Sequence, residues 1–192
     1  GSNVPFRESR YYSYLMREIS LLKGKVPENF ETVSYFCEKA VKNLESKRFL
    51  FSLVMREFLF FQSLHRGEHL FVVDWEYAEH GFPPIFDFYS LMLNEAAERH
   101  RKGTYNEKYL RGIQDAFFSR NKRVAAYSEE LFGLYKVDTY SAYWFFWLFV
   151  IDQLYIHAET DHYLSMKRAL SSLNEVKSNE SFYRRNWLGS GV

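Results

Sequence analysis

The chain has 192 residues, of which 20% are aromatic, and its 25 Lys and Arg are balanced by 24 Asp and Glu. This length suits one domain with a substantial core, and the high aromatic share predicts extensive burial. Because charges of both signs are scattered along the chain, no basic face for nucleic acid is expected.

Three short features bear on location and boundaries. Cys37 is the only cysteine, which excludes an internal disulfide and favours a reducing compartment, with the cytoplasm as the default. The apolar run Tyr140–Ile151 is shorter than the roughly 20 residues of a membrane span, so it predicts a buried helix instead. Residues 1–2, Gly-Ser, resemble the scar of a cleaved tag, and we expect the natural chain to begin near or upstream of Asn3.

The first part of the chain predicts two amphipathic helices. Apolar residues recur every three or four positions over Glu8–Leu22, and Gly24 is expected to end this helix. The pattern repeats over Asn29–Ser46, with Pro27 just before its start. The next segment, Arg48–Leu64, is dense in Phe and aliphatic residues, and its pattern fits either a buried helix or a strand with an irregular loop.

A hairpin and further helices are predicted beyond this segment. Gly67 lies at a plausible turn into the strand Leu70–Asp74. Pro83 and Pro84 cannot lie inside a helix, so the next helix is expected over Ile85–His100. The remaining predicted helices are Asn106–Ser119, Arg123–Leu134, Thr139–Ala158 and Asp161–Leu173.

These elements predict a mainly α (α+β) fold with a small β-hairpin. We expect a single domain over residues 3–175, since no internal repeat or low-complexity linker divides it. Residues 176–192 are expected to form a polar tail, which Phe182, Tyr183 and Trp187 could dock.

Four acids lie in the stretch LFVVDWEYAEHGFPPIFDFY, residues 70–89, and three of them, Asp74, Glu76 and Asp87, are candidate site residues. Asp74 and Glu76 come directly after a strand that the sequence predicts to be buried, and Asp87 lies among aromatic residues. Carboxylates at the end of a buried strand are costly unless they are paired, hydrogen-bonded or bound to metal. The simpler alternative is that Asp74 caps a turn and that Asp87 is an acid favoured at a helix N-terminus.

The segment VVDWEYAEHGFPPIFDFYSLM, residues 72–92, resembles the metal-binding segment and following helix of the aminoglycoside phosphotransferase and choline kinase family, relatives of the protein kinases. The resemblance implies that Asp74 is the magnesium-binding acid and that Asp87 braces the catalytic loop. Glu76 would be a second metal or substrate contact, or a solvated acid. The resemblance is strong from Leu70 to Leu93 and weak elsewhere.

The family's catalytic loop reads His-Gly-Asp, four further residues, then Asn, and an ungapped overlay puts Met55, Arg56, Glu57 and Gln62 at these four positions. Glu57 would then orient the substrate hydroxyl, and Gln62 would help to bind magnesium. Each has a side chain one methylene longer than its counterpart, and misplacement by about 1 Å can cost about a hundredfold in rate. Met55 lacks the polar contacts of His, and Arg56 resists a backbone shape that Gly permits. We therefore expect a differently built loop with reduced or absent activity.

The resemblance covers only the helical C-terminal lobe of such a kinase. Phosphoryl transfer in the family also needs a phosphate-covering loop and a strand Lys on an N-terminal lobe, and no Gly-rich loop precedes Arg48. Within a complete parent protein, the implied reaction is Mg-dependent transfer of the ATP γ-phosphoryl to a hydroxyl on a small molecule or sugar. ATP and Mg are expected as cofactors only if this activity is retained, and the isolated chain is expected to be weak or inactive.

Two other interpretations stay open. The first is a pseudokinase-like scaffold that binds a protein partner without catalysis. The second is an unrelated helical protein with a local resemblance. Geometry can separate these interpretations, because the family requires Asp74 and Asp87 to flank the loop that contains Glu57, with Gln62 close enough to Asp74 to share an ion.

Two further patterns have structural explanations that we favour. The histidines of HAETDH, residues 157–162, are spaced by five and lack the pattern of zinc enzymes, so a helix junction is expected. An aromatic stripe at helical spacing could box a quaternary ammonium group, but such a stripe is more often core. Its members are Tyr143, Trp144, Trp147, Ile151 and Tyr155.

Overall fold

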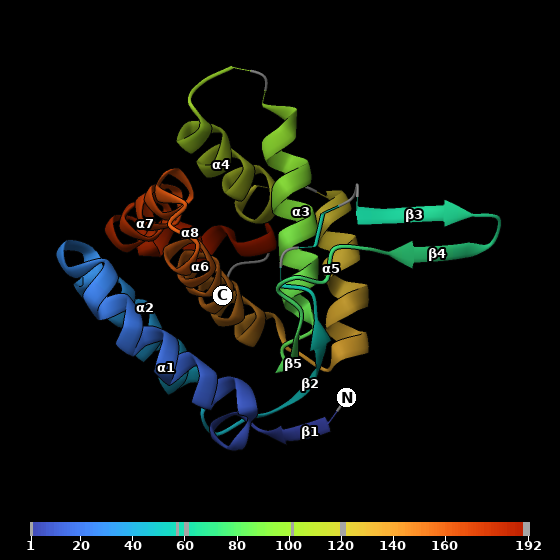
Figure 1. Ribbon diagram of the computed structural model, residues 1–192, viewed down its shortest axis with the longest axis horizontal. Helices are drawn as coiled ribbons and strands as arrows, with labels where there is room; N and C mark the ends of the chain where they lie inside the picture. Colours follow the sequence, from blue (N-terminus) through green and yellow to red (C-terminus); the bar gives the residue numbers. More distant parts are fainter. Residues whose placement is uncertain (1, 57, 60–61, 101, 120–121, 190–192) are drawn as a thin grey trace.

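The computed structural model describes residues 2–56, 58–59, 62–100, 102–119 and 122–189. The fold is mainly helical with a small three-stranded antiparallel sheet. In Figure 1 helix α6 lies in the middle, with α1 and α2 on one side and α3 on the other, and α7 packs against α2, α4 and α6. The helices are α1 (Arg10–Lys25), α2 (Phe30–Leu44), α3 (Ile85–Arg99), α4 (Tyr105–Ile113), α5 (Lys122–Tyr135), α6 (Thr139–Glu159), α7 (Tyr163–Ser178) and α8 (Glu180–Asn186).

The three-stranded sheet brings distant parts of the chain together. Its order is β1 (Ser2–Pro5), β2 (Arg48–Val54) and β5 (Glu79–Phe82), and both neighbouring pairs are antiparallel. A separate hairpin of β3 (Ser63–Arg66) and β4 (His69–Val72) projects from the body of the molecule (Figure 1). Gly67 lies in its turn with a φ of 63°, a conformation that glycine adopts without strain, and the predicted turn is therefore confirmed.

Helix α6 is the centre of the core. Every residue from Ser141 to Leu154 is buried, because other elements surround this helix on all sides. The predicted buried helix is thus confirmed, and the aromatic stripe that includes Trp144 and Trp147 is core. No helix in the described ranges has the length and apolar character needed to cross a bilayer.

Several predicted boundaries differ from the structure. Gly24 does not end the first helix, which continues to Lys25 before a turn that begins at Pro27. The open choice for Arg48–Leu64 is resolved as strand β2 followed by a loop. The predicted helix Asn106–Ser119 divides into α4 and a π-helical turn, Gln114–Phe118. The pair His157 and His162 lies at the α6–α7 junction, as expected.

The C-terminal segment packs onto the core. Helix α7 continues to Ser178 and α8 follows directly, where a polar tail was the first expectation. Tyr183 and Trp187 are buried, whereas Phe182 is half exposed. The Trp187 indole stacks on Phe117 with ring centroids 5.8 Å apart. Two of the three aromatic residues that could dock this segment therefore do so.

Candidate functional site in the loop after strand β2

The residues that the resemblance singles out lie around the connection between β2 and β3, residues 55–62. The N-terminal part, Met55 and Arg56, follows β2 directly, and Gln62 lies just before β3. Glu57, the expected catalytic acid, lies outside the described residues, so the structure assigns it no contact.

Asp87 holds the N-terminal part of this loop. It lies in the first turn of α3, which begins directly after Pro83 and Pro84. Its carboxylate accepts the backbone N–H groups of Met55 at 3.1 Å and of Arg56 at 3.0 Å. Burial raises the pKa of Asp87 to about 6, although the two N–H bonds oppose the shift. The contact is the one that the resemblance implies for a bracing acid.

Arg56 is the most strongly constrained residue of the loop. Its φ is 68°, in the left-handed region that favours glycine, and its side chain is buried. Two guanidinium nitrogens, Nε and Nη2, donate hydrogen bonds to the Asp152 carboxylate of α6. It also donates to Glu18 of α1 at 3.1 Å and to the Tyr14 hydroxyl at 3.2 Å. These bonds, not conformational freedom, hold an arginine where the family pattern has glycine.

Two buried carboxyl groups lie around the single cation of Arg56. Glu18 and Asp152 are both fully buried and share a single guanidinium. Burial, followed by the Asp152 charge, raises the pKa of Glu18 well above its usual range. A protonated Glu18 leaves the Arg56–Asp152 ion pair electrically balanced, which lowers the cost of burying the cluster.

The cluster of Arg56, Glu18 and Asp152 was not predicted, although the sequence contains a signal for it. In α1 the buried residues are Tyr11, Leu15, Glu18 and Leu22, so Glu18 falls in the helical repeat of the apolar face. Asp152 directly follows the apolar run Tyr140–Ile151, which predicts a buried helix. An acid on each of two buried faces indicates a buried cation between them.

Gln62 connects the other end of the loop to Asp74. Its side-chain NH₂ donates to the Asp74 carboxylate at 2.9 Å, and its side-chain oxygen accepts the Leu59 N–H at 2.7 Å. The two side chains are therefore as close as the resemblance requires. However, a magnesium ion needs the amide oxygen, not the NH₂ group. In this arrangement Gln62 is a hydrogen-bond donor to Asp74, and a shared ion would require the amide to rotate away from Leu59.

Asp74 and Glu76 are exposed, which corrects the expectation of a buried strand end. Strand β4 belongs to the projecting hairpin and not to the central sheet (Figure 1). Val73 and Trp75, which flank Asp74, are 40% and 49% exposed. Burial therefore imposes no cost on these two acids, and the reasoning from that cost was wrong for Asp74. Asp74 has a φ of 68°, which Asp tolerates better than most residues.

A small cavity lies between the two ends of the loop. Its volume is about 220 Å³, and its lining is mostly apolar. The lining residues are Leu53, Met55, Phe58, Val72, Trp75 and Asp87. Ligand pockets usually measure about 300–1,000 Å³, so the part of the site that the structure describes accommodates only a small group. Among the described side chains no set of three or more His, Cys, Asp and Glu could hold a metal ion.

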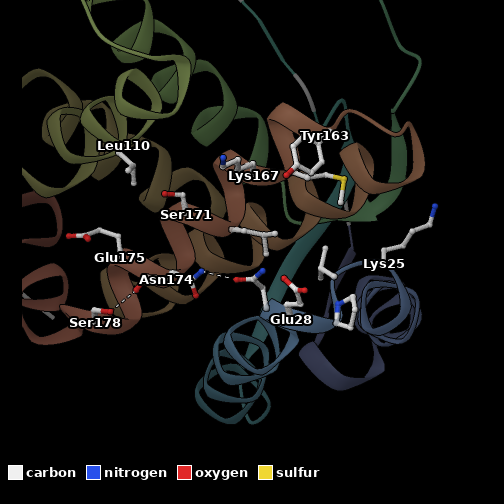
Figure 2. A pocket seen from close by; sticks show the side chains of 14 residues that line it. Lys25, Glu28, Leu110, Tyr163, Lys167, Ser171, Asn174, Glu175 and Ser178 are labelled. Atoms are coloured by element: carbon white, nitrogen blue, oxygen red, sulfur yellow. Dashed lines mark hydrogen bonds between the residues drawn. The ribbon is translucent and has the colours of Figure 1, made fainter.

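A larger pocket, of about 780 Å³, lies away from all of these residues. Figure 2 shows it between the α1–α2 connection and one face of α7, with Lys25 and Glu28 on one wall and Lys167 on the other. The Asn174 amide, near its centre, donates to Asn29 at 3.0 Å. This larger pocket and the predicted acids therefore do not coincide.

Comparison of the chain with protein-family models, with curated proteins and with solved structures found no match. The functional interpretation therefore depends on the sequence resemblance and on the contacts described above.

Proposed function

We propose that this chain is the helical lobe of a phosphotransferase related to the aminoglycoside phosphotransferases and choline kinases. Joined to a nucleotide-binding lobe, it would transfer the ATP γ-phosphoryl to a hydroxyl on a small molecule or sugar. The observation that best supports this proposal is the pair of N–H bonds that Asp87 accepts from Met55 and Arg56. An acid from the following helix thus fixes the loop where the family places its catalytic residues.

Each predicted residue has a defined role in this proposal. Asp74 would bind magnesium, with Gln62 assisting after its amide rotates, and the metal would neutralise charge on the phosphates. Glu57 would orient the accepting hydroxyl, and Glu76 would lie near the metal or substrate. Asp87 acts only on the loop. Because the Gln62 oxygen already accepts the Leu59 N–H, we expect weak activity or none from the chain alone.

Calorimetry with Mg²⁺ and ATP tests the proposal. We expect Mg²⁺-dependent nucleotide binding to a protein that contains both lobes, and phosphorylation of at least one hydroxyl in a panel of sugars and amino alcohols. Asp74→Ala should abolish both signals. Glu68→Ala is the matched control, because Glu68 is an exposed acid at the turn of the same hairpin. Binding of neither Mg²⁺ nor ATP by the two-lobed protein excludes the enzymatic function.

A second candidate function is a non-catalytic, pseudokinase-like scaffold for a protein partner. The observation in its favour is that both ends of the loop are hydrogen-bonded within the chain, Arg56 to Asp87 and Gln62 to Asp74. For this function, millimolar Mg²⁺ should leave the melting temperature unchanged in the wild type and in Asp74→Ala. Phosphoryl transfer that Asp74→Ala abolishes rules it out.

The cytoplasm is the compartment that we propose for either function. It is favoured by the single cysteine, Cys37, which is buried and unpaired.

A further inference from the structure

A separate pocket lies between α3, α4 and α7. Its volume is about 370 Å³, within the usual range for small-molecule sites of about 300–1,000 Å³. Its polar lining residues are Asn94, Glu98, His100, Lys108, Tyr109 and Arg168. His100 follows Asp87 by 13 positions along α3, which separates the two by about 20 Å at 1.5 Å per residue. The pocket is thus distinct from the loop site.

Arg168 forms the base of this α3–α4–α7 pocket. Its side chain is only 9% exposed, and its guanidinium lies over the Tyr109 ring, 4.6 Å from the centroid. One guanidinium nitrogen donates to the Ser165 hydroxyl at 2.9 Å. Stacking and this hydrogen bond fix the orientation of the planar group, so that little entropy is lost when it binds an anion.

Other groups of the pocket add to its positive character. Lys108 lines it from α4 and, within the described ranges, pairs with no carboxylate. His100 lies against Asp115, with 2.8 Å between Nε2 and the carboxylate. Among the described residues of the lining Glu98 is the one acid, and it is exposed. The described lining thus contains two permanent cations, Arg168 and Lys108, and one solvated carboxylate.

We propose that the α3–α4–α7 pocket binds a small phosphate monoester, with its phosphate between Arg168 and Lys108. A guanidinium fork and an ammonium together supply donors for three oxygens, as a phosphate requires. A phosphate monoester also carries nearly two negative charges, whereas a carboxylate carries one, so it can form ion pairs with both cations. The remaining volume holds the organic part of the ester.

Titration calorimetry with inorganic phosphate, glycerol phosphate and acetate tests this site. We expect glycerol phosphate to bind more tightly than inorganic phosphate, and acetate to bind most weakly. Arg168→Gln should weaken glycerol phosphate binding about tenfold or more, and Lys108→Gln several-fold, because charge-assisted hydrogen bonds are lost. Raising the NaCl concentration should weaken binding further.

Lys167→Gln is the matched control, because Lys167 is adjacent to Arg168 on α7 but lines the other, larger pocket (Figure 2). It should leave the affinity unchanged. Since Arg168 is buried, its variant is first compared with the wild type by circular dichroism. Lys108 is partly exposed, so its variant tests the site without disturbing the core. The proposal is overturned if phosphate and acetate bind with equal affinity, or if Lys108→Gln binds glycerol phosphate as tightly as the wild type. The two cations would then only stabilise the C-terminal end of α3.

Discussion

The two ends of the loop 55–62 are held in opposite ways. At the first end, Arg56 is buried and bonded to α1 and α6, and its N–H is bonded to Asp87 of α3. At the second end, Gln62 reaches an exposed Asp74 on a projecting hairpin through one hydrogen bond. Both Arg56 and Gln62 are buried, but only the first end contains buried charges. The comparison therefore indicates that the first end contributes more to folding, whereas at the second end the carboxylate of Asp74 is exposed to solvent.

The largest expected effect is the loss of the Arg56 charge. Arg56→Met leaves Asp152 and Glu18 buried without a cation, and we expect a loss of about 3–5 kcal/mol in the free energy of unfolding. Urea denaturation measures it. The control is Arg10→Met, because Arg10 makes an exposed ion pair with Glu79 and should change stability by less than about 1 kcal/mol.

A variant that also carries Glu18→Gln and Asp152→Asn should recover much of the stability lost by Arg56→Met, because no buried charge then remains unpaired. If Arg56→Met is no more destabilising than Arg10→Met, the buried cluster does not hold the first end of the loop.

The second expected effect is a dependence on pH that comes from Asp87. Its pKa is raised from 3.8 to about 6 in the folded protein. Between these two pH values the unfolded chain has already released this proton and the folded protein still holds it, so stability falls as pH rises. A shift of this size corresponds to about 3 kcal/mol.

Comparing Asp87→Asn with the wild type by urea denaturation from pH 3.5 to 7 isolates this contribution. The difference between their free energies of unfolding should move in favour of the variant as pH rises. Asp161→Asn is the control, because this side chain is 90% exposed. Its free energy of unfolding should change with pH in the same way as that of the wild type. A constant difference between Asp87→Asn and the wild type across this range contradicts the raised pKa.

The third effect concerns the second end of the loop. Gln62→Ala removes the acceptor of the Leu59 N–H and the donor to Asp74, and we expect a loss of about 1–2 kcal/mol. Gln62→Glu keeps the acceptor but places a second carboxylate beside Asp74. It should destabilise the protein in EDTA and regain stability on addition of Mg²⁺, as measured by the melting temperature. A variant whose melting temperature does not respond to Mg²⁺ shows that the two side chains are not placed to share an ion.

Local sequence patterns predicted the parts of the fold that local patterns determine. The helices α1 to α7, the hairpin turn at Gly67 and the burial of α6 follow from periodicity, turn chemistry and a continuous apolar run, whereas α8 was expected to be part of a polar tail. The three-stranded sheet was not predicted because it pairs Ser2 with Phe51 and Ser52 with Phe82. A pattern within one short segment contains no information about such a distant partner.

The candidate site, too, could be predicted from the sequence only in part. The contact of Asp87 with the loop and the proximity of Gln62 to Asp74 follow from motif positions. The orientation of the Gln62 amide, whose NH₂ group and not its oxygen points to Asp74, does not follow from them. The Arg56 cluster was missed because it joins three segments that are far apart in sequence. The exposure of Asp74 was missed because an apolar strand such as β4 was taken to be buried, whereas this one lies on a hairpin outside the core.

The smallest expected effects belong to the exposed acids, and they separate stability from chemistry. Asp74→Asn keeps an oxygen that can accept from Gln62, and Glu76→Gln changes a solvated side chain, so each should alter the free energy of unfolding by less than about 0.5 kcal/mol. If Asp74 binds magnesium, Asp74→Asn nevertheless removes the Mg²⁺ signal in calorimetry, whereas Glu76→Gln reduces it only slightly. A large loss of stability in Asp74→Asn assigns Asp74 a structural role. Both ends of the loop then contribute to the stability of the fold.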